Sequence, residues 1–568
     1  MPPLDVVPAA LQRSFTPRRN RRRSAATLLL GALLAARAAV LPAQATLSHT
    51  DDAIPIPGGW LRLSVLNSWE RYDSRFGENG ALRALGDELS TDSLGPRQLP
   101  RLAAIEAGLK TLTNDPTQRL TFGRLDVRSD ARIVTTPIAL EYGITRRLSF
   151  GVVVPIVQTR RSAQVRVNQR AKDDTTKTSN VGILAESKRA TQAAQNAQFV
   201  ADLTKAATSL TDLLARCAAN PAAAECAPIR GNEAAAAAAA QRATEFAGAV
   251  ATTYGITPAT AVVAPLAGSA LATTIEAQRA AIAAQLTAFV PGSVVGTLPT
   301  APTEFSYIDL QGRAREDGLL QSDLGGGLDS IATTERIGIG DVELRARLLL
   351  IDHVQRDSLP LRGPQVRLGL GGIVRFATSR PDSATDLLDI GTGDGPGIEV
   401  RSALDLRAGR VGATVGARFA TFSAQTVTAP LIGNPIGGFP YPLFGEVSRK
   451  AGNVVGVDVT PRIFVGEWLA FEGLYGREHT DAATFTASDA TPCSDCTVLP
   501  NSILPDARTV QRVGMGVRYS TVDAFLRRRA KYPVEVSYRH LETITGDPGA
   551  PKLFRDQIQL RIYYRLFR

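Results

Sequence analysis

Apolar and polar residues alternate along most of the chain with a period of two. The pattern is clearest in residues 127–161, where Leu148 and Phe150 begin a run of apolar residues on every other position. This is the period of a β-strand with one apolar face. Earlier in the same stretch the apolar phase moves from odd to even positions near Pro137, which predicts a β-bulge. Residues 127–161 therefore predict a hairpin of two strands that turns at 144–147.

The predicted strands are long. Each arm of this hairpin has about 15 residues, whereas strands of soluble domains average roughly 5–6. A tilted strand that crosses a bilayer needs about 9–11 residues for the hydrocarbon alone. Variants of the pattern return to the C-terminus and predict twelve strands, at residues 60–72, 127–143, 148–161, 335–352, 364–378, 397–409, 410–424, 450–465, 467–480, 508–525, 531–545 and 555–567.

The lengths of the connections divide by parity. Very short links follow the second, sixth and eighth strands, and the long links follow odd-numbered strands. Outer-membrane barrels have an even number of strands, short periplasmic turns and long external loops. A soluble sandwich has no reason to separate its loops in this way. The expected fold class is all-β, a 12-stranded antiparallel transmembrane β-barrel of the outer-membrane type, with an α-helical insertion between strands 3 and 4.

The insertion, residues 162–333, has a different period. Apolar residues from Phe199 onward fall at helical spacing, and Asn232 can cap an Ala-rich helix at 233–254. We expect a helical hairpin or three-helix unit that packs on itself. The alternatives are a plug inside the lumen and a binding part outside it. A further short helix is expected around 102–109.

The two faces of the predicted strands differ in chemistry. One face is apolar, and the other carries arginines and carboxylates, which cannot face lipid because Arg costs roughly 2–4 kcal/mol near the bilayer midplane. Arginine outnumbers carboxylate, which favours either a pore with an anion bias or an ion-pair network that fills a narrow interior. The residues expected to line the lumen are Arg124, Asp126, Arg128, Asp130, Arg132, Asp341, Glu343, Arg345, Arg347, Arg367, Arg375, Glu399, Arg401, Asp405, Arg407, Arg418, Asp458, Arg462, Glu472, Arg512, Arg518, Glu535, Arg539, Arg561 and Arg565.

Composition and targeting agree with export. After the N-terminus no stretch of about 18 apolar residues occurs, which excludes a helical membrane protein. Residues 1–45 contain a basic segment, an apolar run and the cleavage site Ala43-Gln44-Ala45, so a signal peptide is expected there and the barrel in 46–568. The chain has 568 residues and a net charge of +10. Without the signal segment the charge falls to about +4, so nucleic acid is not an implied partner.

The four cysteines form two local pairs. Cys217 lies near Cys226, and Cys493 lies near Cys496. An oxidising compartment favours a disulfide in each pair. The second pair could instead be a redox site or half of a zinc site, but it stands in a Thr, Pro, Ser and Asp loop without a second pair or a His cluster. We therefore expect two structural disulfides and neither a metal nor a cofactor.

Three stretches resemble a known family. They are YGITRRLSFGVVVPI at 142–156, GIGDVELRARLLL at 338–350, and residues 376–419, in which a strand end, a loop with Gly391, Thr392, Gly393 and Asp394, and a hairpin follow in order. These are similar to the outer-membrane barrels of the MetA-pathway phenol-degradation family. The resemblance covers most strand regions and none of the helical insertion. It implies a barrel that moves small, often aromatic, compounds across the outer membrane, and it carries over no catalytic residue.

The leading hypothesis is a channel for small solutes, aromatic or anionic, in the outer membrane of a Gram-negative-type bacterium. The expected partners are outer-membrane lipid and lipopolysaccharide, the solute and the barrel-assembly machinery. A surface-exposed structural or adhesive protein, with the helical insertion as the binding part, is the alternative. A hydrolase is the third possibility, since His479 stands beside Asp481. No nucleophile signature accompanies that pair, so an enzyme is not expected.

Overall fold

The computed structural model describes most of the chain beyond the N-terminal segment. No described helix is both long and apolar enough to cross a membrane. The described residues are Ala53 and residues 56–168, 179–293, 295–313, 318–353, 364–380, 383, 385–393, 395–430, 444–487, 507–526 and 528–566. The expected signal peptide and the pair Cys493 and Cys496 lie outside them.

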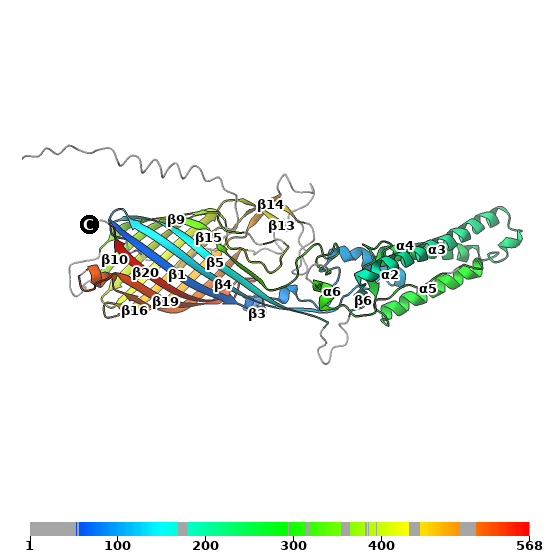
Figure 1. Ribbon diagram of the computed structural model, residues 1–568, viewed down its shortest axis with the longest axis horizontal. Coiled ribbons are helices and arrows are strands. Elements are labelled where there is room, and N and C mark those ends of the chain that lie inside the picture. The colour runs from blue at the N-terminus through cyan, green and yellow to red at the C-terminus, as the bar shows by residue number, and fades with distance from the viewer. Residues whose placement is uncertain are drawn as a thin grey trace, which may run out of the picture. The chain divides into compact units, whose positions relative to one another are not determined.

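Twelve antiparallel strands, counted over the described residues, close into a barrel (Figure 1). Closure comes from β4, which pairs with β5 on one side and with β1 on the other. One of the twelve is interrupted at Gly340 and Asp341, and its halves β8 and β9 both pair with β5. The 12-stranded barrel is thereby confirmed. Its strands are β1 (Trp60–Tyr72), β4 (Leu125–Gly143), β5 (Leu148–Val167), β8 (Thr334–Ile339) with β9 (Val342–Asp352), β10 (Pro364–Phe376), β11 (Gly397–Ala408), β12 (Val411–Phe422), β15 (Val454–Val465), β16 (Leu469–Thr480), β18 (Arg508–Ser520), β19 (Val534–Gly546) and β20 (Phe554–Arg565).

The remaining elements lie in the links between barrel strands. Three small sheets pair β2 (Ser74–Phe76) with β3 (Leu82–Ala84), β6 (Val181–Ile183) with β7 (Val263–Pro265), and β13 (Gln425–Pro430) with β14 (Phe444–Lys450) and β17 (Thr484–Ala487). The helices are α2 (Ala103–Thr113), α3 (Glu186–Ala219), α4 (Glu233–Tyr254), α5 (Ala270–Phe289), α6 (Tyr307–Gln311) and α7 (Val522–Leu526). We call the barrel end with the turns at 144–147, 409–410 and 466–468 the short-turn end, and the opposite end the long-loop end.

The inserted helices do not pack only on themselves, contrary to our expectation. One hydrophobic core joins α3, α4 and α5 to α2, which precedes the barrel hairpin in sequence, and to Leu125 and Val127 of β4. The contact between α2 and α4 is close at Gly108, where a Cβ atom would lie 2.1 Å from Oγ1 of Thr253. The insertion is therefore anchored on the two segments that flank the start of β4.

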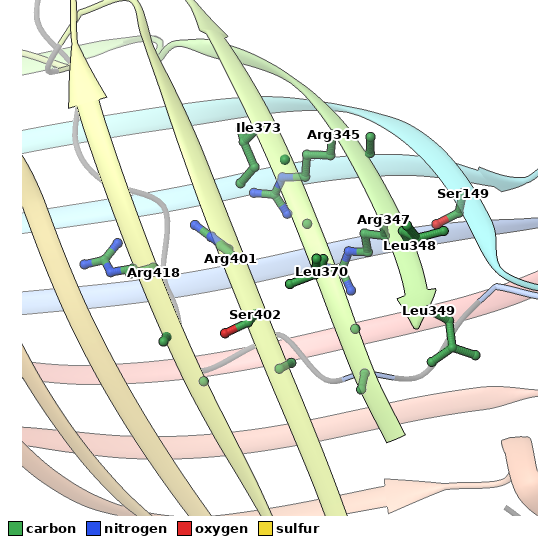
Figure 2. Close-up of a pocket in the computed structure, with 18 of the residues that line it drawn as sticks. Ser149, Arg345, Arg347, Leu348, Leu349, Leu370, Ile373, Arg401, Ser402 and Arg418 are labelled. Atoms are coloured by element: carbon green, nitrogen blue, oxygen red, sulfur yellow. The ribbon is translucent and has the colours of Figure 1, made fainter. Parts of the chain in front are cut away.

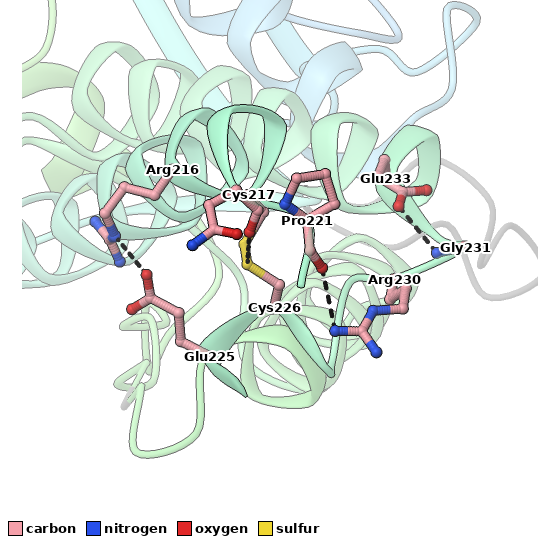
Figure 3. The surroundings of a disulfide bond; sticks show 9 residues. Arg216, Cys217, Pro221, Glu225, Cys226, Arg230, Gly231 and Glu233 are labelled. Carbon is pink, nitrogen blue, oxygen red and sulfur yellow. Dashed lines mark hydrogen bonds and ion pairs between the residues drawn. A yellow bond between two sulfur atoms is a disulfide. The ribbon is translucent and has the colours of Figure 1, made fainter. Parts of the chain in front are cut away.

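A disulfide ties the hairpin of α3 and α4 together (Figure 3). Cys217 at the end of α3 is bonded to Cys226 in the link to α4, with Cα atoms 5.6 Å apart. Around it, the carboxylate of Glu225 accepts from Nε of Arg216 at 3.1 Å. Because the two cysteines are nine residues apart, the bond closes a short loop and constrains the unfolded hairpin.

Replacing both Cys217 and Cys226 with serine is expected to destabilise the helical hairpin by about 2–3 kcal/mol, since the loop is short. The urea concentration at which the helical circular dichroism is half lost should fall. Dithiothreitol should shift the natural protein in the same direction and leave the double variant unchanged. An unaltered midpoint would mean that the helical core alone holds the hairpin.

The bulge expected near Pro137 is wrong. The pairing of β4 with β5 runs in one register from Leu125 opposite Val167 to Gly143 opposite Ser149. Odd-numbered residues of β4 point inward along the whole strand, and even-numbered residues point outward. The outward residues are apolar at Ile138 and charged at Arg132. The apolar residues therefore move from odd to even positions, although the same positions point outward along the whole strand. The change follows the surroundings of the outer face: lipid along one part of the strand and water along the other.

Candidate functional site

The lumen of the barrel is lined by the charged face of its strands. Inward positions are even-numbered in β1, β12, β15, β16 and β18 and odd-numbered in β4, β9, β10, β11, β19 and β20, as their burial shows. Of the residues named from the sequence, the structure places these on inward positions: Glu343, Arg345, Arg347, Arg367, Arg375, Glu399, Arg401, Asp405, Arg407, Arg418, Asp458, Arg462, Glu472, Arg512, Arg518, Glu535, Arg539 and Arg561.

Ion pairs fill much of this interior. On the described barrel strands, six glutamates each pair with two arginines, so that each carboxylate is shared. Glu472 accepts from Nε of both Arg462 and Arg539 at 2.8 Å, and its side chain is fully buried. The six sets are Glu141 with Arg62 and Arg347, Glu343 with Arg345 and Arg375, Glu399 with Arg375 and Arg401, Glu472 with Arg462 and Arg539, Glu478 with Arg418 and Arg512, and Glu535 with Arg518 and Arg561.

Glycines opposite the long side chains make room for them. Gly456 pairs with Arg418 across β15 and β12, and a Cβ there would come within 2.9 Å of Nε of the arginine. Gly516 stands in the same way against Arg539, where a Cβ would lie 2.9 Å from Cγ. A larger inward residue at either position would push the guanidinium out of its ion pair.

Three cavities follow one another along the lumen. The short-turn cavity, about 90 Å³, is lined by Arg367, Arg407 and Phe464. The central cavity, about 70 Å³, is lined by Arg345, Arg347, Arg401 and Arg418, which project from neighbouring strands in Figure 2. The long-loop cavity is the largest, at about 430 Å³, and is lined by residues at the long-loop ends of the strands. Within the described chain, no residue of α3, α4 or α5 lines any of them.

Polar clusters separate the cavities. Arg418 lines both the central and the long-loop cavity and pairs with Glu478, which also accepts from Arg512 at 3.3 Å. Between the central and short-turn cavities, Thr414 donates to Asp405 and accepts from Arg462. A solute that traverses the lumen has to pass both clusters.

The chain before β1 also reaches into the lumen, which the sequence analysis did not foresee. The backbone N–H of Ala53 donates to Oδ2 of Asp405 at 2.8 Å, and Ala53 lines the central cavity. Opposite it, a Cβ on Gly369 would lie 3.6 Å from the Ala53 Cβ. The sequence signal is the absence of a side chain at the inward positions Gly369 and Gly371 of β10, which leaves room in the lumen beside this strand.

The outer face is apolar over the same height. Val65, Ile138 and Leu560 stand in one row across β4, β1 and β20, and all three point outward. Ile138 is 38% exposed and Leu560 37%. Near the short-turn end, the exposed rings of Trp468 and Tyr519 pack edge-on with their centroids 6.4 Å apart, as in the aromatic girdle at a membrane interface. The protein is a transmembrane β-barrel of the outer-membrane type.

The comparisons with known proteins find distant structural similarity. No family model and no curated protein matches the chain. Among solved structures it is similar to the COG4313 outer membrane channel from Pseudomonas putida F1, at 9% identity and a TM-score of 0.38 over 90% of this chain and 98% of that one. It is also similar to a Pseudomonas aeruginosa FadL homologue, at 8% identity and a TM-score of 0.23 over 90% and 91%. With all scores this low, the strand pairing within this chain carries the assignment of the barrel.

Several charged residues assigned to the lumen lie elsewhere. Arg128 and Arg132 are exposed on the outward face of β4, and Asp126 and Asp130 share that face. Arg124 precedes the strand and lies 3.8 Å from Asp92. These five residues belong to the part of the hairpin that faces water, where an outward charge costs nothing. In addition, Arg565 is exposed at the end of β20.

Two further residues named from the sequence lie at the long-loop end, and one of them, Asp341, lines the long-loop cavity. Asp341 is 4% exposed in the break between β8 and β9, where its carboxylate accepts from the backbone N–H groups of Thr378 and Ser379 at 3.2 Å. It therefore holds the link after β10 in place. His479 lies on the outward face of β16, 3.1 Å from Oγ1 of Thr509 and 3.4 Å from Asp481. Its ring lines none of the three cavities of the described chain, so the hydrolase hypothesis gains no substrate pocket.

Five charged residues of the barrel interior were not foreseen as part of the site. Arg62 and Glu141 form a buried ion pair near the short-turn end, with Nε 2.6 Å from Oε2. Glu70 pairs with Arg555 at 2.9 Å near the long-loop end, and Glu478 pairs with Arg418 and Arg512. All five stand on alternate positions of predicted strands, so the period-two pattern carried a signal for each of them.

Proposed function

We propose that the protein is an outer-membrane channel through which small solutes pass by way of the arginine-rich lumen. The observation that carries the proposal is the series of three cavities within one closed barrel. A barrel whose interior served only as a rigid filling would have no need of cavities at both ends and in the middle. The proposal includes an export signal in residues 1–45 and, as a finer assignment, membership of the MetA-pathway phenol-degradation family.

The ion pairs determine how such a channel would work. Each cluster between cavities consists of charged groups that can exchange partners, so a polar or anionic group on the solute can take the place of a carboxylate. More arginines than carboxylates face the lumen, and anions should therefore pass more readily than cations. The two clusters at Glu478 and Thr414 set the narrow points.

Single-channel conductance of the refolded mature protein in planar bilayers tests the proposal. We expect discrete conductance steps. In a potassium chloride gradient, we expect a reversal potential whose sign shows that chloride passes more readily than potassium. A version that lacks residues 180–292 should also conduct, because no described residue of that region's long helices lines a cavity. If neither version conducts, the ion-pair network is a structural filling of the barrel. That result would favour the alternative of a surface-exposed structural or adhesive protein.

Arg418 provides a variant with a defined effect on conduction. Because it stands between the central and long-loop cavities, Arg418→Ala should widen the passage, raise the conductance and shift the reversal potential toward zero. Arg477→Ala, on the outward face of β16, is the matched control and should leave both unchanged. Equal conductance of Arg418→Ala and the natural protein would show that ions do not pass this cluster.

A further inference from the structure

In the part of the chain that the structure describes, two arginines of the long-loop cavity have no ion pair. They are Arg449 on β14 and Arg508 at the start of β18. Among the described residues, neither guanidinium has an acceptor within hydrogen-bond or ion-pair distance. The other arginines of the cavity do have carboxylate partners, such as Glu478 for Arg512 and Glu70 for Arg555.

Arg449 is half-buried on the small sheet of β13, β14 and β17. Its Nε atom is buried and, among the described residues, makes no hydrogen bond. Directly opposite on β13 stands Gln425, which is 4% exposed and whose side-chain oxygen and nitrogen also lack partners among the described residues. A buried polar atom without a partner is costly, and an anionic ligand in the cavity would supply the acceptor that the Nε of Arg449 lacks.

Arg508 reaches the same cavity from the barrel wall. It pairs in register with Thr480 of β16, and both residues line the cavity together with Tyr72 at the end of β1. The phenol of Tyr72 can donate a hydrogen bond to the same anionic group that a guanidinium binds. The barrel and the small sheet thus contribute polar donors from different sides of one space.

The rest of the wall contains paired charged residues and an apolar part. Ile133, Val157 and Phe422 line the cavity from three strands, and Pro137, Pro155, Leu85, Ile390, Val454 and Leu553 extend this surface. The volume of about 430 Å³ falls in the range of about 300–1,000 Å³ that is usual for small-molecule sites. A ligand that satisfies both parts of this wall has an apolar body and one anionic head.

We propose that the long-loop cavity is a binding site for small organic monoanions, of which an aromatic carboxylate is the type, with Arg449 and Arg508 as the residues that hold the carboxylate. A neutral hydrocarbon would fill the apolar part and leave both guanidinium groups without a counter-charge. An inorganic anion such as phosphate would neutralise the charge of the arginines but would leave the apolar part of the wall without a contact. The proposal deepens the proposed channel function and rests on it for its role, since the site would load solute at the long-loop end.

Equilibrium binding to the full mature protein, refolded in detergent micelles, tests the site separately from conduction. Titration calorimetry with benzoate is compared with benzyl alcohol, which keeps the ring and lacks the charge, and with inorganic phosphate. We expect benzoate to bind at least about tenfold more tightly than either, since it alone combines a carboxylate for the two guanidinium groups with a ring for the apolar residues. Added chloride should weaken the binding of benzoate.

Variants assign the binding to the two arginines. Arg449→Gln and Arg508→Gln should each weaken benzoate binding about tenfold or more, whereas Arg477→Gln, on the outer face, should not change it. Arg449→Lys keeps the charge without the planar fork and should fall between the natural protein and Arg449→Gln, which also covers the case in which the glutamine variant does not fold. Equal affinity for benzoate and benzyl alcohol, or unchanged binding in both glutamine variants, would overturn the site. Conduction without benzoate binding would refute the site alone, and binding without conduction would refute the channel alone.

Discussion

Replacement of Glu472 by alanine is expected to lower the free energy of unfolding of the barrel by about 3–5 kcal/mol, the cost of leaving a buried ion pair without one partner. Both Arg462 and Arg539 donate to this carboxylate at 2.8 Å. The variant would leave two guanidinium groups buried at 7% and 3% exposure without their shared acceptor. Denaturant unfolding of the protein folded in phospholipid vesicles, followed by tryptophan fluorescence, measures the loss.

Two controls separate the missing charge from the missing volume. Glu472→Gln keeps the shape and one acceptor oxygen, so it should cost less than the alanine variant but still more than a surface change. Glu225→Ala removes a half-exposed partner of Arg216 and should cost less than about 1 kcal/mol. A loss below about 1 kcal/mol in Glu472→Ala would show that water enters the lumen and solvates these arginines.

The strands and their number could be predicted because a period of two is a local property of the sequence. The partners of the charged residues could not, since they depend on register and on strands that are distant in sequence. Glu472 and Arg539 are 67 residues apart and meet across Gly516, which lies between them on β18. Nothing near either residue in the sequence indicates that a glycine will stand there.

The charged segment of β4 shows where the same reasoning fails. Charge on a barrel strand indicates the lumen only at heights where lipid covers the outside. At Arg128 and Arg132 the outside is water, and the inward residues Val127 and Ala131 are apolar because they are buried within the protein. Apolar and polar residues alternate in the same way whether the outer face contacts lipid or water. The sequence pattern therefore shows that the apolar residues share one face of the strand, but it does not show whether that face points into the barrel or away from it.

The candidate binding site lay in a link that had no predicted strand. Residues 425–449 were expected to form a long loop, yet β13 and β14 pair there and bring Arg449 to the lumen. Their runs are six and seven residues long and are rich in Thr, Ser, Lys and Arg, so they show little apolar alternation. The structure of this link is set by its contact with β17, a third short strand that lies in another loop.

Arginine in place of Ile138 is expected to destabilise the barrel by about 2–4 kcal/mol, the cost of that side chain on the lipid face near the midplane. Ile138 points outward beside Val65, which in turn pairs with Leu560, so the row marks the middle of the apolar band. The comparison is Arg132→Leu on the same face of the same strand, which should change the stability by less than about 0.5 kcal/mol because its surroundings are aqueous. Unfolding in phospholipid vesicles gives both values. If the two substitutions cost the same, the boundary between lipid and water does not fall between residues 132 and 138, and the change of apolar phase at Pro137 needs another cause.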